Sequence, residues 1–185
     1  MSPSKPRTGF ASAQWQERLL ADGQNWLIVV TRSMAPLVEP GDRVRVARAT
    51  AAQLRLGDLV VFWRDDSLFV HRYLGQARDA RRLECGDHAL RLGSFADREL
   101  VGRVSRVAKG AAAIDLAAAP WPQLGVVLGL GSRLVLGWPG PLPFRRSIWR
   151  GAVGAALRCA GLARPDRSRL ADQRAGPDIE PDSEA

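Results

Sequence analysis

The chain has 185 residues with 46% hydrophobic side chains, which suits one domain of ordinary size flanked by tails. Its 2 cysteines and 2 histidines show no metal-ligand spacing, so we expect no disulfide framework, no metal site and no cofactor. The net charge of +8 comes almost entirely from scattered arginines, without the basic–aromatic clusters of nucleic-acid modules. We therefore do not expect a nucleic-acid partner. The two lysines, Lys5 and Lys109, lie far in sequence from the candidate nucleophile described below.

The N-terminal region predicts a lead without structure, followed by one short helix. Residues 1–11 are expected to be disordered. Ser12 is a suitable N-cap for a helix through Ala21, and Gly23 is a suitable stop signal. Because no apolar segment follows the basic start, we expect neither a signal peptide nor an N-terminal membrane anchor.

The hydrophobic pattern over residues 12–110 predicts a compact, mainly β domain that opens with the short helix. Residues 26–30 are continuously apolar, which is typical of a strand buried on both faces. Residues 43–48 alternate polar and apolar side chains with period two, as a half-buried strand does. Further antiparallel or mixed strands are expected at 59–63 and 68–74, joined by a turn at 64–67, and at 81–85 and 100–108.

The C-terminal part predicts an extension over residues 111–163 and a disordered tail over 164–185. Residues 111–119 are small and predict a linker. The apolar stretch 124–138 is shorter than the roughly 20 residues that a membrane span needs. Residues 144–162 predict an amphipathic helix with a basic face.

Two fates are open for that amphipathic helix. It either packs on the β domain, or it lies in a membrane interface with its arginines toward anionic lipid. In the second case residues 121–160 make a peripheral membrane contact. The expected location is the cytoplasm or the inner face of the membrane.

Three segments at the ends of expected strands carry reactive side chains. Ser33 lies in a tight turn after the first strand, His71 lies in an apolar strand, and Asp87 follows Gly86. A serine hydroxyl needs a base within hydrogen-bonding distance, and an imidazole whose other nitrogen meets a carboxylate suits that task. Each of these features alone is common in turns and strands that have no function. Their combination is what points to chemistry.

This combination resembles the signal-peptidase-like serine peptidases, a superfamily that joins type I signal peptidases and LexA-type self-cleaving repressors. The resemblance covers roughly residues 26–108 and rests on five short blocks in the family's order. The blocks are Ser33-Met34-Ala35-Pro36 with Pro40-Gly41-Asp42-Arg43-Val44, Gly57-Asp58-Leu59-Val60-Val61-Phe62, Val70-His71-Arg72, Cys85-Gly86-Asp87 and Leu100-Val101-Gly102-Arg103-Val104. It implies the β fold of that superfamily and a serine endopeptidase that cleaves a peptide or precursor protein.

The resemblance also implies roles for individual residues. Histidine at the place of the base is similar to the ER and archaeal type, whereas most bacterial signal peptidases and the repressors use a Ser-Lys pair. Ser33 would be the nucleophile, His71 the general base and Asp87 the acid, with Asp97 as the alternative acid. The backbone N–H of Ser33 and the Thr31 hydroxyl would stabilise the oxyanion.

The substrate is expected to bind as a strand added beside residues 26–30. Four residues are assigned to its groove: Met34, Pro36, Trp26 and Ile28. A second interpretation is a catalytically inactive or autoregulatory peptide-binding domain of the same fold, and a third is a peripheral membrane-binding module.

Overall fold

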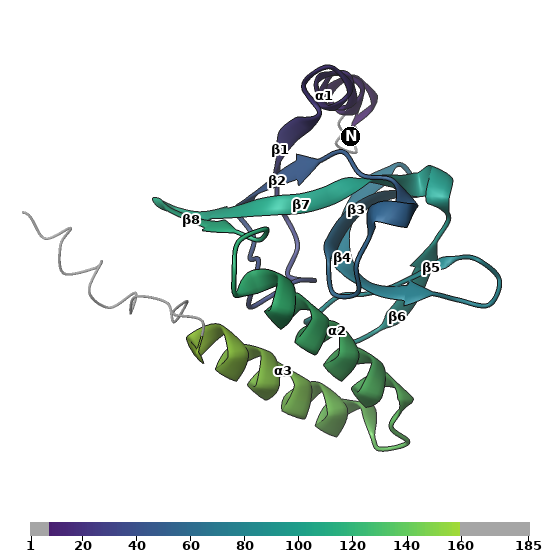
Figure 1. The fold of residues 1–185 in the computed structure, drawn as a ribbon, viewed down its shortest axis with the longest axis vertical. Coiled ribbons are helices and arrows are strands. Elements are labelled where there is room, and N and C mark those ends of the chain that lie inside the picture. The colour runs from purple at the N-terminus through teal and green to yellow at the C-terminus, as the bar shows by residue number, and fades with distance from the viewer. Residues whose placement is uncertain (1–7, 160–185) are drawn as a thin grey trace, which may run out of the picture.

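The computed structural model describes residues 8–159, which form one antiparallel sheet and three α-helices (Figure 1). The mainly β class expected from the sequence is confirmed. In chain order the elements are α1 (Thr8–Asp22), β1 (Gln24–Ile28), β2 (Arg43–Ala47), β3 (Leu59–Arg64), β4 (Ser67–Gln76), β5 (Arg82–Cys85), β6 (Leu92–Phe95), β7 (Leu100–Lys109), β8 (Ala112–Asp115), α2 (Trp121–Gly137) and α3 (Leu142–Cys159).

The strands follow the order β1-β2-β7-β3-β4-β5-β6, and β8 pairs with β7 off this path. Every neighbouring pair is antiparallel. The β3–β4 hairpin turns at Asp65 and Asp66, whose φ angles are 47° and 57°. Positive φ at both central positions matches the right-handed twist of the flanking strands. This hairpin places His71 beside β5.

The sheet is strongly curved, and its two faces build two separate apolar clusters (Figure 1). Val61 belongs to the larger cluster, whereas its neighbours Val60 and Phe62 belong to the smaller one. Successive side chains of a strand point to opposite faces, so β3 is buried on both sides. The smaller cluster also contains Tyr73 and Phe95.

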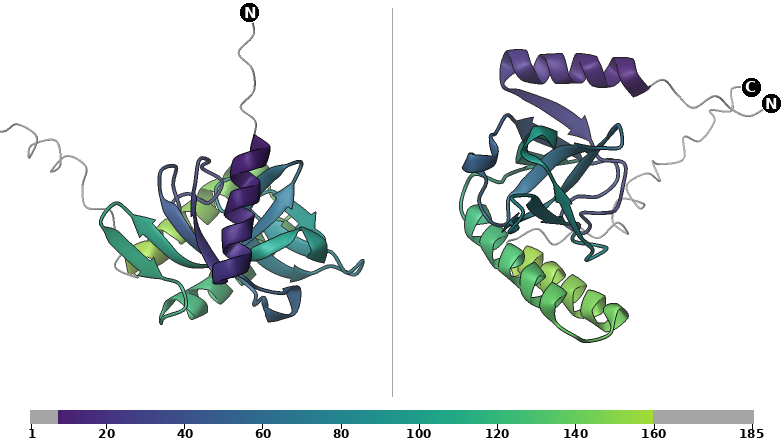
Figure 2. Two further views of the ribbon diagram at one scale, coloured as in Figure 1. Left: turned by 90° about the horizontal axis from the view of Figure 1, so that it is seen from above. Right: turned by 90° about the vertical axis from the view of Figure 1, so that its right-hand side faces the viewer.

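The helices lie on opposite sides of the sheet, with α1 on one side and the α2–α3 hairpin on the other (Figure 2). Trp149 and Val153 of α3 are buried in the larger core cluster. Helix α2 approaches the bend before β3 so closely that a Cβ on Gly57, whose φ is 90°, would lie 1.8 Å from the carbonyl oxygen of Gly125. One side of the amphipathic helix therefore packs on the domain, the first of the two fates left open by the sequence, and its exposed side leaves membrane contact untested.

The N-terminal helix begins earlier than expected. Helix α1 starts at Thr8, so residues 8–11 are helical and the prediction of a disordered lead is wrong for them. Residues 1–7 lie outside the described part. Gly23 follows the helix with φ of 69°, in agreement with its expected role as a stop signal.

The prediction that residues 26–30 are buried on both faces is wrong. Strand β1 is at the edge of the sheet, and its side chains alternate between exposed and half-buried. Trp26 and Ile28 are 40% and 61% exposed. A continuous apolar run does not reveal whether a strand is central or marginal, because that depends on the order of the strands.

Strands β6 and β8 were not expected from the sequence. The predicted linker at 111–119 contains β8, which extends the sheet through Asp115 by pairing with β7. Ala112 and Ala113 carry no β-branched signal, so only the backbone pairing reveals this strand. None of the helices within residues 8–159 is both long and apolar enough to cross a membrane. Residues 160–163 and the predicted tail 164–185 lie outside the described part.

Candidate active site

Ser33 lies in the turn that leads from β1 to β2, and backbone hydrogen bonds fix this turn. The N–H of Ala35 donates to the carbonyl of Arg32 at 3.0 Å, and the N–H of Val38 donates to that of Met34 at 3.0 Å. Met34 and Val38 are fully buried, whereas Ser33 is only half-buried. Buried apolar side chains that follow Ser33 therefore anchor the turn, and the hydroxyl stays near the surface.

Ser33 and His71 meet at Gly86. A Cβ built on Gly86 would lie 3.2 Å from Nε2 of His71 and 3.4 Å from Cβ of Ser33. The serine side chain and the imidazole Nε2 thus line the same small space, which Gly86 leaves open. The N–H of His88 donates to the carbonyl of Ser33 at 2.9 Å, and this bond holds the serine turn against the loop after β5.

The other imidazole nitrogen contacts Glu84 on β5. Nδ1 of His71 lies 2.5 Å from Oε2 of Glu84, and Arg64 donates to Oε1 of the same carboxylate at 2.9 Å. Burial raises the pKa of Glu84, but the hydrogen bonds and charges of His71 and Arg64 outweigh burial and hold the pKa below its ordinary value. Because an ionised carboxylate only accepts, Nδ1 of His71 carries a proton and donates it to Glu84.

Aromatic side chains lie around the His71 ring. The ring centroid of His71 lies 6.0 Å from that of Phe62 and 5.9 Å from that of Phe69, both in edge-on geometry. Arg64 lies over both phenylalanine rings, at 5.0 and 5.4 Å from their centroids. The His71 side chain is 14% exposed and that of Glu84 is 1% exposed. Apolar walls of this kind strengthen a charge-assisted hydrogen bond.

Asp87, the acid expected from the sequence, does not contact His71. Its carboxylate binds Arg72 through two bonds, Nε–Oδ1 at 2.9 Å and Nη2–Oδ2 at 2.5 Å, and both side chains are buried. Arg72 also donates to the carbonyl of Gly57 at 2.9 Å. The pair therefore ties the loop after β5 to β4 and to the bend before β3.

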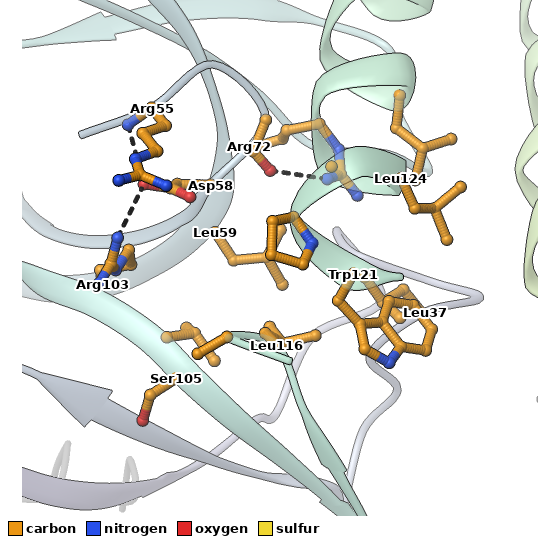
Figure 3. Close-up of a pocket in the computed structure, with 16 residues that line it drawn as sticks. Leu37, Arg55, Asp58, Leu59, Arg72, Arg103, Ser105, Leu116, Trp121 and Leu124 are labelled. Carbon is orange, nitrogen blue, oxygen red and sulfur yellow. Dashed lines mark hydrogen bonds and ion pairs between the residues drawn. The ribbon is translucent and has the colours of Figure 1, made fainter. Parts of the chain in front are cut away.

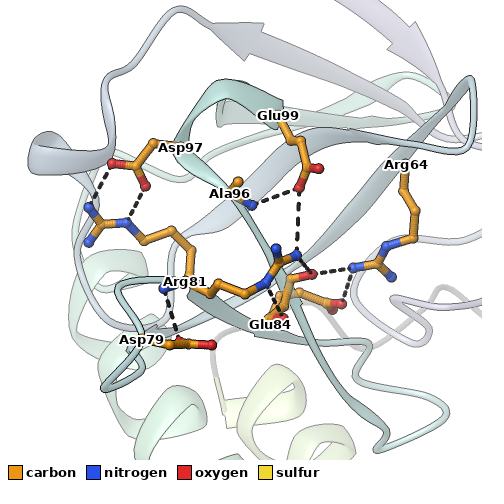
Figure 4. Close-up of polar contacts among 9 residues, drawn as sticks. Arg64, Asp79, Arg81, Glu84, Ala96, Asp97 and Glu99 are labelled. Atoms are coloured by element: carbon orange, nitrogen blue, oxygen red, sulfur yellow. Dashed lines mark hydrogen bonds and ion pairs between the residues drawn. The ribbon is translucent and has the colours of Figure 1, made fainter.

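Asp97, the alternative acid, also pairs with an arginine. Arg82 forms two bonds with its carboxylate, at 2.7 and 3.0 Å, and Asp97 is exposed. Figure 4 shows Asp97 and Glu84 engaged by different arginines on separate parts of the β5–β6 region. The sequence-based choice of Asp87 or Asp97 as the partner of His71 is therefore wrong. The carboxylate that contacts His71 is that of Glu84.

Strand alternation explains why Glu84, rather than Asp87, reaches His71. Glu84 pairs with Tyr73 across β4 and β5, and Tyr73 is two residues from His71, so all three side chains share one face. Asp87 is two residues from Cys85, which pairs with Arg72 on the opposite face. In the sequence, the available signal for this acid was a Glu between the apolar residues Leu83 and Cys85. Its partner could not be assigned without the register of the two strands.

The expected oxyanion groups lie next to the serine. The Thr31 hydroxyl lies 3.2 Å from the Ser33 hydroxyl. Within residues 8–159 the backbone N–H of Ser33 donates no hydrogen bond. Both groups are therefore close to the Ser33 hydroxyl, and their role as oxyanion donors stays a prediction.

The four residues expected to line the groove have different environments. Met34 is a fully buried core residue, so its assignment to a groove is wrong. Pro36 is exposed and lines a surface hollow beside the serine turn. Trp26 and Ile28 are exposed on the edge strand β1, where Arg43 lies 5.6 Å from the centroid of the Trp26 ring.

A cavity of about 180 Å³ lies elsewhere, between the bend before β3, strand β7 and the start of α2 (Figure 3). Arg55, Asp58 and Trp121 are among its lining residues, whereas Ser33 and His71 are not. Burial and the neighbouring carboxylates raise the pKa of the Cys85 thiol to about 12, which disfavours the reactive thiolate.

Comparison with protein-family models and with curated proteins gave no match for this chain. The evidence for the candidate site is therefore its geometry alone. The His71 ring lies between the buried carboxylate of Glu84 and the serine turn, and Gly86 leaves space between His71 and Ser33.

Proposed function

We propose that the chain is a serine endopeptidase of the signal-peptidase-like type, with Ser33 as nucleophile, His71 as general base and Glu84 as the acid. The observation that carries the proposal is the position of the His71 ring. Its Nδ1 is held 2.5 Å from Glu84, and its Nε2 shares with Ser33 the space left by Gly86.

The reaction that this arrangement supports is acyl transfer to Ser33. His71 Nε2 takes the hydroxyl proton as the serine oxygen attacks the scissile carbonyl carbon, and Glu84 stabilises the imidazolium that forms. The N–H of Ser33 and the Thr31 hydroxyl stabilise the oxyanion. His71 then gives its proton to the leaving amine, and water releases the acyl group by the same steps in reverse roles.

The edge strand β1 supports binding of an extended peptide. Within the described chain β1 has a neighbour on one side only, and it leads into the Ser33 turn. Part of its outer edge is already used, because Trp15 Nε1 donates to the carbonyl of Trp26 at 2.6 Å. We therefore place the added strand of substrate along Ile28 and the residues that follow it, next to Ser33.

The experiment that tests the proposal is labelling with a fluorophosphonate probe. The full chain should be labelled at Ser33, and the Ser33→Ala variant should not be. Labelling that is equal in both, or absent from the wild type at pH 7–8, would favour the inactive or autoregulatory peptide-binding domain instead. Folding of each variant is checked by thermal unfolding.

A second proposal concerns the α2–α3 hairpin, for which we propose contact with the inner, anionic face of a membrane. We call the exposed apolar residues on its outside the outer hairpin face: Val126, Val127, Leu130, Leu134, Trp138, Phe144 and Ile148. Residues 116–159 contain no Asp or Glu and 5 arginines, so the hairpin as a whole carries a positive charge that complements anionic lipid. Peripheral binding of this kind requires no membrane span.

A further inference from the structure

A surface hollow of about 840 Å³ lies directly beside the serine turn. Arg32, the residue before Ser33, lines it, and so does His88, whose N–H holds the Ser33 carbonyl. The opposite wall comes from α3, through Pro143, Arg146, Ser147, Arg150 and Gly151. The hollow therefore joins the candidate nucleophile to the C-terminal helix.

The charge of this hollow is strongly positive. Three arginines line it, Arg32, Arg146 and Arg150, against one carboxylate, that of Glu39. Neither Arg32 nor Arg150 forms an ion pair with any carboxylate in the described part of the chain. Most other arginines near the site are engaged, as Arg64 and Arg72 are with Glu84 and Asp87. Arginines left without a carboxylate in a concave site are suited to bind one from another molecule.

The wall from α3 is fixed relative to the serine. Nε of Arg146 donates to the carbonyl of Ala89 at 2.9 Å, which attaches the helix to the loop that carries His88. Trp149 and Val153, on the neighbouring side of α3, are buried in the core. Arg146 and Arg150 are one helical turn apart, so both reach the same side of the helix. The α3 wall of the hollow is thus attached both to the core and to the loop beside the serine turn.

From this arrangement we infer that the peptidase selects substrates with an acidic side chain, Asp or Glu, close to the bond that is cleaved. The carboxylate lies in the hollow between Arg32 and Arg150 while the peptide backbone passes Ser33. The inference rests on the proposed function and specifies its substrate class. A bound carboxylate forms charge-assisted hydrogen bonds worth about 1.5–3 kcal/mol each, which corresponds to a preference of about 10-fold or more over the matching amide.

The test is a positional peptide library given to the full wild-type chain, with the cleavage products read by mass spectrometry. We expect Asp and Glu to be enriched about 10-fold over Asn and Gln at one position near the cut. The Arg150→Glu variant should lose this enrichment and gain Lys or Arg at the same position. Arg98→Glu, which makes the same change of charge at an exposed residue outside the hollow, should behave as the wild type does.

A binding arm separates failure of the inference from failure of the proposed function. The same library is passed over immobilised Ser33→Ala protein, and the retained peptides are identified. If no peptide is cleaved but acidic peptides are retained through Arg150, the chemistry is wrong and the recognition stands. Cleavage or retention without a preference for acidic peptides would overturn the inference. An acidic preference that Arg150→Glu leaves unchanged would also overturn it.

Discussion

At the scale of single residues, the site depends on which carboxylate meets which base. Glu84 and Asp87 are three residues apart, yet their side chains lie on opposite faces and bind different partners, His71 and Arg72. In the proposed mechanism the two acids therefore have separable roles: Glu84 orients His71, and Asp87 positions the loop that contacts the serine turn. Substitutions that remove only the charge distinguish them.

Glu84→Gln should abolish most of the reactivity of Ser33 while the chain remains folded. The amide no longer holds a proton on Nδ1 of His71, so the tautomer that frees Nε2 is lost. In a serine triad the corresponding change lowers kcat by on the order of 10⁴. The rate of fluorophosphonate labelling measures the effect, and an unchanged rate would remove Glu84 from the mechanism.

Asp87→Asn should act mainly on stability. It leaves the guanidinium of Arg72, which is 2% exposed, buried without its counter-charge. Removing one partner of a buried pair costs about 3–5 kcal/mol. Urea denaturation followed by tryptophan fluorescence would report this loss in the free energy of unfolding. A variant that unfolds like the wild type but loses labelling of Ser33 would show that Asp87 acts in the chemistry after all.

At the scale of elements, β6 provides the space in which the acid lies. Gly93 pairs directly with Glu84 across β5 and β6, and a Cβ at this position would lie 1.9 Å from Oε1 of Glu84. Any side chain on residue 93 must therefore displace the carboxylate from Arg64 or from His71. A strand that the sequence did not predict thus determines where the acid lies.

Gly93→Ala should lower the labelling rate of Ser33 by at least about 10-fold, since one lost charge-assisted hydrogen bond is worth 1.5 kcal/mol or more. The matched control is Gly110→Ala, at a glycine whose added Cβ would meet no atom within 4 Å. Gly110 has φ of 58°, so Gly110→Ala should lose stability through backbone strain. It should nevertheless be labelled at Ser33 as fast as the wild type. Equal labelling of Gly93→Ala and the wild type would contradict this account of β6.

At the scale of the whole molecule, the α2–α3 hairpin has an inner side and an outer side with different properties. The inner side belongs to the core through Leu128, Trp149 and Val153. The outer hairpin face is apolar and exposed, and Leu134 is its most exposed member at 76%. Removing the hairpin would therefore disturb the fold, and point substitutions on its outer side are the better test.

We expect the full chain to float with vesicles containing phosphatidylglycerol and not with pure phosphatidylcholine vesicles. The double variant Leu134→Glu/Phe144→Glu should lose flotation, because two charges would enter the apolar interface. Leu92→Glu, at a 51% exposed leucine on β6, is the control and should float normally. Absence of flotation would contradict the membrane proposal. Wild-type self-association that the double variant abolishes would instead assign this face to a second copy of the chain.

Much of the β domain follows from the sequence alone. Period-two alternation predicts β2, and apolar segments bounded by turns predict β3, β4, β5 and β7, all close to their observed bounds, because these signals are local. Gly23 marks the end of α1 for the same reason. The segments that carry Ser33 and His71 were also identified locally, as a turn after a strand and a histidine within one.

Only the tertiary structure decided what those segments meet. The order of the strands places residues 24–28 at an edge of the sheet. The register of β4 against β5 brings His71 into contact with Glu84 and Arg72 into contact with Asp87. A shift of one residue in that register would reverse both assignments, since side chains alternate between the faces of a sheet. Pairing between strands is a non-local property, and for that reason neither the acid of the site nor the basic hollow beside Ser33 was visible in the sequence.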